Sequence, residues 1–172
     1  TQKTMRIAQQ LYEGVEIKGR GSIGLITYLR TDSTRVSETA EAQVKEFIEG
    51  NYGDDYMATE IVSKKSSKKI QDAHEAIRPS MPAMTPERVK SSLTADQYKL
   101  YRLIWERFIA SQMADALLDT VSVDIEADNC MFKATGSTVK FDGFTVLYEE
   151  SRDVPEEKTP ALPELLEGET LK

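Results

Sequence analysis

The sequence has 172 residues, a net charge of −7 and a hydrophobic content of 40%, enough for one core or two small domains. Its single cysteine, Cys130, excludes an intramolecular disulfide, and no apolar run reaches the ~18 residues of a membrane span. Residues 1–80 carry twelve basic and twelve acidic side chains, whereas residues 81–172 carry ten and seventeen. The acidic balance argues against a general nucleic-acid binder, and a phosphate ligand is expected only in the first half.

The first half of the sequence predicts a helix, a strand and a second helix. The first helix covers residues 3–13, and its apolar stripe consists of Met5, Ala8, Leu11 and Tyr12. A glycine-rich connection follows, and a buried strand is expected at Leu25–Leu29. The second helix is expected to begin with Ser37 as its N-cap and to end at the sequence GNYG. Its buried face consists of Ala40, Val44, Phe47 and Ile48.

The second half begins with two further helices. Thr85 and Pro86 indicate the start of a short helix. Thr94 and Gln97 form a capping box at the start of a long helix that is expected to reach Leu118. Its apolar residues surround much of the circumference and are Leu100, Leu103, Ile104, Phe108 and Met113. This helix is therefore expected to be central in the fold.

From Thr120 the hydrophobic period changes from that of a helix to that of a strand. Val121, Val123 and Ile125 alternate with polar residues, which predicts a half-buried strand. The turn-forming sequences ADN, TGS and FDGF then predict further short antiparallel strands through Tyr148. Helices followed by antiparallel strands indicate an α+β fold.

The segment LITYLRTDSTR, residues 25–35, begins as an apolar strand and continues as a run of hydroxyl and charged groups. In a strand, alternate residues share a face, so Tyr28, Arg30 and Asp32 are expected to point the same way. Arginine binds phosphate oxygens in pairs, and a phosphate held by Arg30 lies within reach of the Tyr28 hydroxyl. An adjacent cation favours the phenolate and stabilises charge on the phosphate. The pattern therefore suits covalent attack by tyrosine on a phosphodiester.

The polar residues that follow fit the same site but also have a simpler explanation. Asp32 is placed to pin the Arg30 guanidinium, and Thr31 and Ser33 are placed to donate hydrogen bonds to the phosphate. Aspartate, serine and threonine before a helix are equally typical of N-terminal capping, and a Tyr-x-Arg sequence often recurs by chance. The spacing alone leaves both interpretations open, and the structural one is the more common.

The sequence AHEAIRP contains His74, the only histidine in the chain, and Arg78. A protonated histidine can hold a phosphate or assist proton transfer, although a lone histidine is more often a surface or core residue. A zinc site of histidine and cysteine ligands is excluded because the partner residues are absent. The acidic pair Asp54 and Asp55 resembles metal ligands but is better explained as a turn.

Three segments together resemble the type IA DNA topoisomerases, specifically the bacterial topoisomerase I branch. GLITYLRTDSTR is similar to the family's active-site signature, and AHEAIRP is similar to a second signature downstream. TMRIAQQLYE resembles the helix that precedes the tyrosine segment. The segments occur in the family's order across most of residues 1–150. The leucine between Tyr28 and Arg30 suits the topoisomerase I branch, since topoisomerase III relatives more often have proline there.

The resemblance implies a role for each matching residue. Tyr28 becomes joined to a DNA 5′-phosphate, Arg30 positions and stabilises the scissile phosphate, and His74 contacts the phosphate backbone or aids proton transfer. The further expected contacts with DNA are Gln9, Glu13, Thr27, Thr31, Asp32, Ser33 and Arg78. The implied reaction cleaves one DNA strand, passes another through the gap and reseals the first without ATP, which relaxes negative supercoils.

The resemblance also implies an architecture within a longer protein. Residues 1–117 are expected to form a mostly helical, winged-helix-like tyrosine domain. Residues 118–150 are expected to form a short antiparallel β segment of the arch domain, and residues 151–172 an acidic linker or the entry to the next domain.

The family's magnesium is held by a toprim domain, whose Asp-x-Asp cluster is absent from this sequence. The chain alone is therefore expected to bind no metal and to be inactive. Its expected partners are single-stranded DNA and the remaining domains of the enzyme, in the cytoplasm at the nucleoid and without a membrane.

Two other functions stay open from the sequence. A non-catalytic winged-helix DNA-binding or regulatory module would use the basic sequence SKKSSKK, residues 63–69, to contact phosphates. A purely structural α+β domain would bind no DNA at low salt. Substitution of Tyr28 separates the enzyme from both, because only the enzyme needs the phenol for a covalent adduct.

Overall fold

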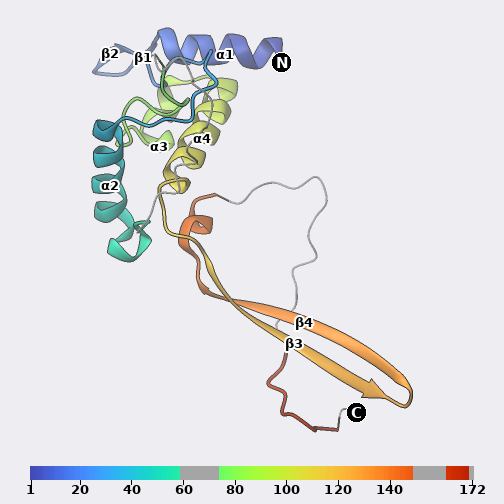
Figure 1. The fold of residues 1–172 in the computed structure, drawn as a ribbon. Helices are drawn as coiled ribbons and strands as arrows, with labels where there is room; N and C mark the ends of the chain where they lie inside the picture. The colour runs from blue at the N-terminus through green and yellow to red at the C-terminus, as the bar shows by residue number, and fades with distance from the viewer. Residues whose placement is uncertain (59–73, 149–161, 171–172) are drawn as a thin grey trace. The chain divides into compact units, whose positions relative to one another are not determined.

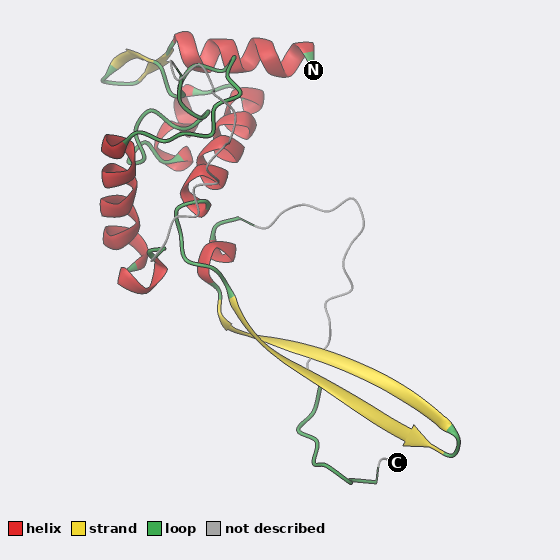
Figure 2. Cartoon of the chain, in the orientation of Figure 1, coloured by secondary structure: helices red, strands yellow, loops and turns green. Residues whose placement is uncertain are grey.

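The computed structural model describes residues 1–58, 74–148 and 162–170. The chain forms two compact units, Thr1–Ala114 and Asp115–Lys172. The described part of the first unit is mostly helical, and that of the second contains a long β-hairpin (Figures 1 and 2). Helices followed by antiparallel strands agree with the predicted α+β class. Among the residues described, no helix is both long and apolar enough to cross a membrane.

Helices and one small hairpin make up the described part of the first unit. They are α1 (Gln2–Glu13), β1 (Val15–Ile17), β2 (Gly21–Ile23), α2 (Glu38–Tyr52), η1 (Asp54–Tyr56), α3 (Pro86–Val89), η2 (Lys90–Ser92) and α4 (Ala95–Ala110), where η denotes a 3₁₀ turn. The sequence predicts only a glycine-rich connection where β1 pairs antiparallel with β2. The turn of this hairpin requires Gly19 at φ 78°, a conformation that favours glycine.

The core of the first unit draws on all four helices. Its most deeply buried side chains include Leu11, Val44, Ile48, Val89, Tyr101 and Ile109. The predicted face of α2 is confirmed, with Phe47 half-buried edge-on against Trp105. The predicted stripe of α1 is buried only at its middle, since Met5 and Tyr12 are 45% and 38% exposed.

Helix α4 is central as predicted, and the predicted core residues Phe108 and Met113 are buried, but most of the buried face differs from the predicted one. That face consists of Tyr101, Trp105, Phe108 and Ile109, whereas the expected core residue Leu103 is 45% exposed. Buried tyrosine and tryptophan need partners for their polar ends. The Tyr101 hydroxyl donates to the carbonyl of Met84 at 2.6 Å, and Trp105 Nε1 donates to the carbonyl of Pro82 at 2.9 Å. These satisfied polar ends allow the aromatic face, instead of the Leu103 face, to enter the core.

The predicted helix starts are confirmed, but their caps differ in kind. Thr94 and Gln97 form the predicted capping box of α4, and the Thr85 side chain accepts from the backbone at the start of α3. Ser37 stands at the N-cap of α2 without a capping hydrogen bond to the helix. Its side chain instead contributes to the lowered pKa of Glu75.

The end of α4 was predicted wrongly, because the helix stops at Ala110 and not near Leu118. The Ser111 hydroxyl donates back to a carbonyl of the last turn at 2.6 Å. Met113 then forms a β-bridge with Met57, which keeps Met113 buried outside the helix. Pairing with a distant segment has replaced further helical hydrogen bonds.

The strand predicted at Leu25–Leu29 is also wrong in extent, because the segment forms a single β-bridge between Ile26 and Pro79. Backbone hydrogen bonds of 2.9 Å flank the bridge. The ladder does not continue on either side, because the N–H of Leu25 donates to the carbonyl of Leu11 and the N–H of Arg78 donates to the side-chain hydroxyl of Thr27. The chain then bends at Leu29 and Arg30, so the alternation of a strand is lost just where the predicted site begins.

The second unit contains one long antiparallel hairpin. Its elements are β3 (Leu117–Ala127), β4 (Cys130–Phe141) and the following 3₁₀ turn η3 (Gly143–Val146). The prediction of several short strands is wrong, because the sequence TGS lies inside β4 and only Asp128, at φ 53°, and Asn129 make the turn. Val121 is 52% exposed, since a two-stranded ribbon has no second layer to bury one face.

Candidate active site

Tyr28 follows the Ile26 bridge and is half-buried, with its ring between two aromatic neighbours. The ring centroid of His74 lies 4.8 Å away with an interplanar angle of 38°. The ring of Tyr12, on the last turn of α1, lies 5.5 Å away at 69°, an edge-on contact. The structure therefore brings Tyr28 and His74, the phenol and imidazole predicted from separate motifs, into direct contact.

Thr27 joins the two motifs through its side chain and its backbone. Its hydroxyl donates to the carbonyl of Ala76 at 2.8 Å and accepts from the N–H of Arg78 at 3.0 Å. Its own N–H donates to the carbonyl of Arg78 at 2.9 Å, and the N–H of Ala76 donates to the carbonyl of Arg35. The residues on either side of Tyr28 are thus bonded to the segment that carries His74, which fixes the place of the imidazole.

Arg78, expected as a contact to DNA, turns inward. It is 9% exposed, and its Nε and Nη2 lie 2.8 and 2.7 Å from one carboxylate oxygen of Glu75. Its Nη1 donates to the carbonyl of Pro79 at 3.0 Å. All three nitrogens of the guanidinium form hydrogen bonds or ion pairs with residues of the same segment. Arg78 therefore stabilises the conformation of the His74 segment.

Glu75 is the partner that keeps Arg78 in place. Burial favours a higher pKa for Glu75, but the hydrogen bond and charge of Arg78, with contributions from Ser37 and Arg35, hold that pKa below its ordinary value. A lowered pKa means that the carboxylate is stabilised in its charged form. The Glu75–Arg78 ion pair is therefore charged at neutral pH, next to His74 in the sequence.

Arg30 and Asp32 are both exposed. In the described part of the chain no ion pair joins them, so the expectation that Asp32 pins the guanidinium is not met. The bend at Leu29 and Arg30 removes the strand geometry on which that expectation depends. Arg30 lacks any hydrogen bond or ion pair to the described residues, which leaves its planar fork available to a phosphate.

Thr31 and Ser33 fix the loop that follows Arg30. The hydroxyl of Thr31 accepts from the N–H of Ser33 at 3.0 Å, and the hydroxyl of Ser33 accepts from the N–H of Arg35 at 3.2 Å. Such side-chain-to-backbone bonds two residues apart are typical of threonine and serine turns. These residues shape the loop, and their expected contact with DNA stays a prediction.

Helix α1 brings Gln9 and Glu13 to the same region of the chain. The Gln9 side-chain amide donates to the Glu13 carboxylate at 2.6 Å, one helical turn away. The end of α1 is bonded to the tyrosine segment, because the N–H of Leu25 donates to the carbonyl of Leu11 at 2.8 Å. A Cβ at Gly24 would lie 2.6 Å from the Tyr12 carbonyl, so this close approach requires glycine.

Sequence reasoning did not identify Tyr12 or Glu75 as parts of this site. Tyr12 was assigned to the apolar stripe of α1, although it stands beside Glu13, which was assigned to the site. Glu75 lies next to His74 and three residues before Arg78, a spacing typical of ion pairs on one face. The position of Tyr12 next to Glu13, and of Glu75 next to His74, was the feature of the sequence from which both could have been identified.

The basic sequence at residues 63–69 lies outside the described residues. Within the described ranges there is no group of three or more histidine, cysteine, aspartate or glutamate side chains able to hold a metal ion. Asp54 and Asp55 lie in the η1 turn that follows α2. The donor set of these residues therefore does not fit a magnesium site.

The full length of the chain, residues 1–172, matches the family model described as DNA topoisomerase. Among solved structures, the chain is similar to full-length topoisomerase I from Thermotoga maritima, with 40% sequence identity and a TM-score of 0.74. The match covers 92% of this chain and 26% of the Thermotoga chain. The chain therefore belongs to the DNA topoisomerase family, and within it to the bacterial type IA enzymes.

Proposed function

We propose that this chain is the tyrosine-bearing part of a type IA topoisomerase, with Tyr28 as the nucleophile that cleaves one DNA strand. The observation that carries the proposal is the contact between the rings of Tyr28 and His74, with centroids 4.8 Å apart. A tyrosine packed only for stability has no need of an imidazole on its face and an exposed arginine two residues later. The chain spans 26% of the Thermotoga enzyme, so the activity belongs to a longer protein.

In the proposed reaction, the Tyr28 oxygen attacks phosphorus and forms a phosphotyrosine bond to the 5′ end of the broken strand. The bond from phosphorus to the 3′ oxygen breaks, and the released 3′ oxygen takes up one proton, which balances the proton that the Tyr28 phenol gives up on attack. Resealing is the reverse attack by the 3′ hydroxyl, which restores the phenol. One phosphodiester is exchanged for another, so the cycle needs no ATP and leaves the DNA changed only in its linkage.

Arg30 and His74 take different roles in this reaction. The Arg30 guanidinium binds the phosphate oxygens, where negative charge grows during attack. The imidazole of His74 lies against the Tyr28 ring, which restricts the direction of the phenol, and its protonated form contacts the phosphate backbone. Thr27 and the Glu75–Arg78 pair support these groups through hydrogen bonds within the protein, and the contacts of Thr27 and Arg78 with DNA stay predictions.

The finer architecture is also proposed here by resemblance to the family. Residues 1–117 would form a winged-helix-like domain, residues 118–150 would belong to the arch, and residues 151–172 would lead to the next domain. A toprim domain elsewhere in the enzyme would hold the magnesium, since the described residues offer no fitting ligands. The whole enzyme would act on single-stranded DNA in the bacterial cytoplasm, at the nucleoid.

The test compares Tyr28→Phe with Tyr12→Phe in the complete enzyme. Tyr12 is a matched control because its ring touches that of Tyr28, and both substitutions remove only a hydroxyl. We expect Tyr28→Phe to abolish the covalent adduct with a single-stranded oligonucleotide while leaving non-covalent binding intact. Adducts that persist in Tyr28→Phe, or disappear only in Tyr12→Phe, would contradict the proposal.

A second experiment concerns the chain by itself. We expect the isolated chain with magnesium to give no relaxation of supercoiled plasmid, because the proposed metal-binding domain is missing. Addition of the remaining domains should restore relaxation. Relaxation by the isolated chain would show that residues 1–172 already contain the complete catalytic centre.

A further inference from the structure

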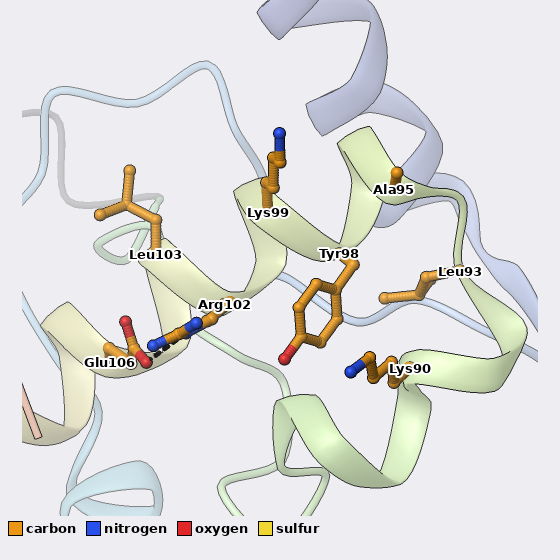
Figure 3. A pocket seen from close by; sticks show the side chains of 8 residues that line it. All are labelled: Lys90, Leu93, Ala95, Tyr98, Lys99, Arg102, Leu103 and Glu106. Atoms are coloured by element: carbon orange, nitrogen blue, oxygen red, sulfur yellow. Dashed lines mark hydrogen bonds and ion pairs between the residues drawn. The ribbon is translucent and has the colours of Figure 1, made fainter.

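A groove lies along α4. None of the residues that line it belongs to the Tyr28 site. Its volume is about 560 Å³. It is lined by Lys90, Leu93, Ala95, Tyr98, Lys99, Arg102, Leu103 and Glu106 (Figure 3). The lining comes from η2, from Leu93 and from α4 between Ala95 and Glu106, and a capping box and a buried aromatic face hold α4 in place.

The groove carries a positive charge although the chain as a whole is acidic. Three basic residues and one acidic residue line it, a net charge of +2 in a chain of net charge −7. Arg102 pairs with Glu106 at 2.6 Å. In the described part of the chain, Lys90 and Lys99 have no ion-pair partner, and the nearby Asp96 carboxylate is bonded to Lys3. An anionic ligand would therefore meet two ammonium groups that form no ion pair with a described residue, although the Asp96 carboxylate also attracts Lys99.

The groove also presents an aromatic ring and apolar side chains to solvent. The Nζ of Lys90 lies 5.5 Å from the centroid of the Tyr98 ring. Figure 3 shows the ring between Lys90 on one side and Arg102 on the other, with Leu93 beside it. Leu103, at the far end of the groove, is 45% exposed. An aromatic face flanked by cations is the arrangement with which proteins bind single strands, by stacking bases and holding phosphates.

We propose that this groove is a second contact site for single-stranded DNA, separate from the Tyr28 site. A base would lie against Tyr98 and the neighbouring Leu93, and the phosphates on either side would bind Lys90 and Lys99. An acidic peptide would pair with the two lysines, but it would not account for the half-exposed ring of Tyr98, which lies between Lys90 and Arg102. The proposal uses the family's DNA substrate and is independent of the chemistry at Tyr28.

The location is tested by nuclear magnetic resonance of the chain titrated with a short oligothymidylate at low salt. We expect backbone amide shifts in residues 90–103, whatever happens near Tyr28 and His74. Shifts confined to the surroundings of Tyr28 and His74 would overturn this inference and leave the proposed function standing. The absence of any shift in residues 90–103, including when no binding occurs, would overturn it as well.

The chemistry is tested with the double variant Lys90→Ala/Lys99→Ala and with Tyr98→Ala, measured by fluorescence anisotropy. Loss of two phosphate contacts should lower the slope of log affinity against log salt by about 1.4. Loss of one stacked base should weaken binding roughly fivefold or more. A double variant with an unchanged salt slope would contradict the proposal, even if Tyr98→Ala proved unstable.

The matched control is Lys133→Ala/Lys140→Ala on β4, which removes the same charge from exposed positions of the hairpin. We expect this control to retain the salt slope and affinity of the unchanged chain. Equal losses in the control and the groove variant would mean that net charge alone drives binding. Binding of a poly-glutamate peptide in preference to DNA would assign the groove to a protein partner and end the proposal.

Discussion

The ring of Tyr28 lies 4.8 Å from the ring of His74, and the hydroxyl of the neighbouring Thr27 bonds the residues that follow His74. This hydroxyl donates to the Ala76 carbonyl at 2.8 Å and accepts from the Arg78 N–H at 3.0 Å, across a sequence separation of 49 to 51 residues. A single threonine therefore sets the register between the two motifs. The predictions below test this register, the groups that support it and the exposed arginine beside it.

Thr27→Val should destabilise the first unit, because it keeps the shape of the side chain and leaves the bonded Ala76 carbonyl and Arg78 N–H with one partner fewer. The expected loss in the free energy of unfolding is on the order of 1–3 kcal/mol, measured by urea denaturation. Thr27→Ser retains the hydroxyl and should lie close to the unchanged chain. A valine variant as stable as the serine variant would show that the hydroxyl does not hold the two segments together.

Glu75→Gln should destabilise the chain at neutral pH and have little effect in acid. The pKa of Glu75 is lower in the folded chain than its ordinary value of 4.5, so its contribution is present above that value and is lost as the pH falls through the folded pKa. Thermal midpoints of the two proteins should therefore differ at pH 7 and converge below about pH 4.5. A difference that stays constant or widens in acid would rule out the charged Glu75–Arg78 pair as its source.

Tyr101→Phe should destabilise the core without changing its shape. The Tyr101 hydroxyl is fully buried and donates to the Met84 carbonyl at 2.6 Å, and burial raises the pKa of this phenol. Removal of the donor should cost roughly 1–2 kcal/mol in the free energy of unfolding. Tyr98→Phe, at a half-exposed position on the same helix, should cost much less, and equal losses would contradict this assignment.

Arg30→Ala should separate catalysis from folding. Arg30 is exposed and has no bond to another described residue. The free energy of unfolding of the variant should therefore stay within about 0.5 kcal/mol of that of the unchanged chain. In the complete enzyme, formation of the covalent adduct should fall by ~10²-fold, because charge on the phosphate is no longer stabilised. Normal adduct formation in a folded Arg30→Ala enzyme would remove Arg30 from the proposed mechanism.

Local signals in the sequence were sufficient to predict several helix starts. Thr94 and Gln97 satisfy each other's backbone groups within one turn, so no distant residue is needed for the prediction. The same holds for Thr85 with Pro86 at the start of α3. The contact between the tyrosine and histidine motifs was expected only through the family resemblance, since their spacing contains no information about distance in space.

Features that depend on distant residues could not be predicted from local patterns. The strand at Leu25–Leu29 is not extended because the N–H of Leu25 donates to the carbonyl of Leu11, and α4 stops because Met113 pairs with Met57. The buried face of α4 depends on carbonyls that accept from Tyr101 and Trp105. Each of these partners is remote in sequence from the pattern that was used to predict the element.

The inward direction of Arg78 has the same origin. An arginine four residues after a histidine in a signature suggests a contact with phosphate, and the sequence does not show that Glu75 folds back to receive it. The structure places both nitrogens nearest to Glu75 within 2.8 Å of its carboxylate. Charge pairing within the motif therefore turns its single arginine away from solvent.

The most direct test of the central claim is to identify the residue that becomes covalently joined to DNA. The complete enzyme would be trapped with a labelled single-stranded oligonucleotide, digested with protease and nuclease, and analysed by tandem mass spectrometry. We predict one modified peptide that contains the sequence LITYLR, with the nucleotide on Tyr28 through its 5′-phosphate. A nucleotide attached to Tyr12 or to any residue other than Tyr28, or attached through a 3′-phosphate, would contradict the account.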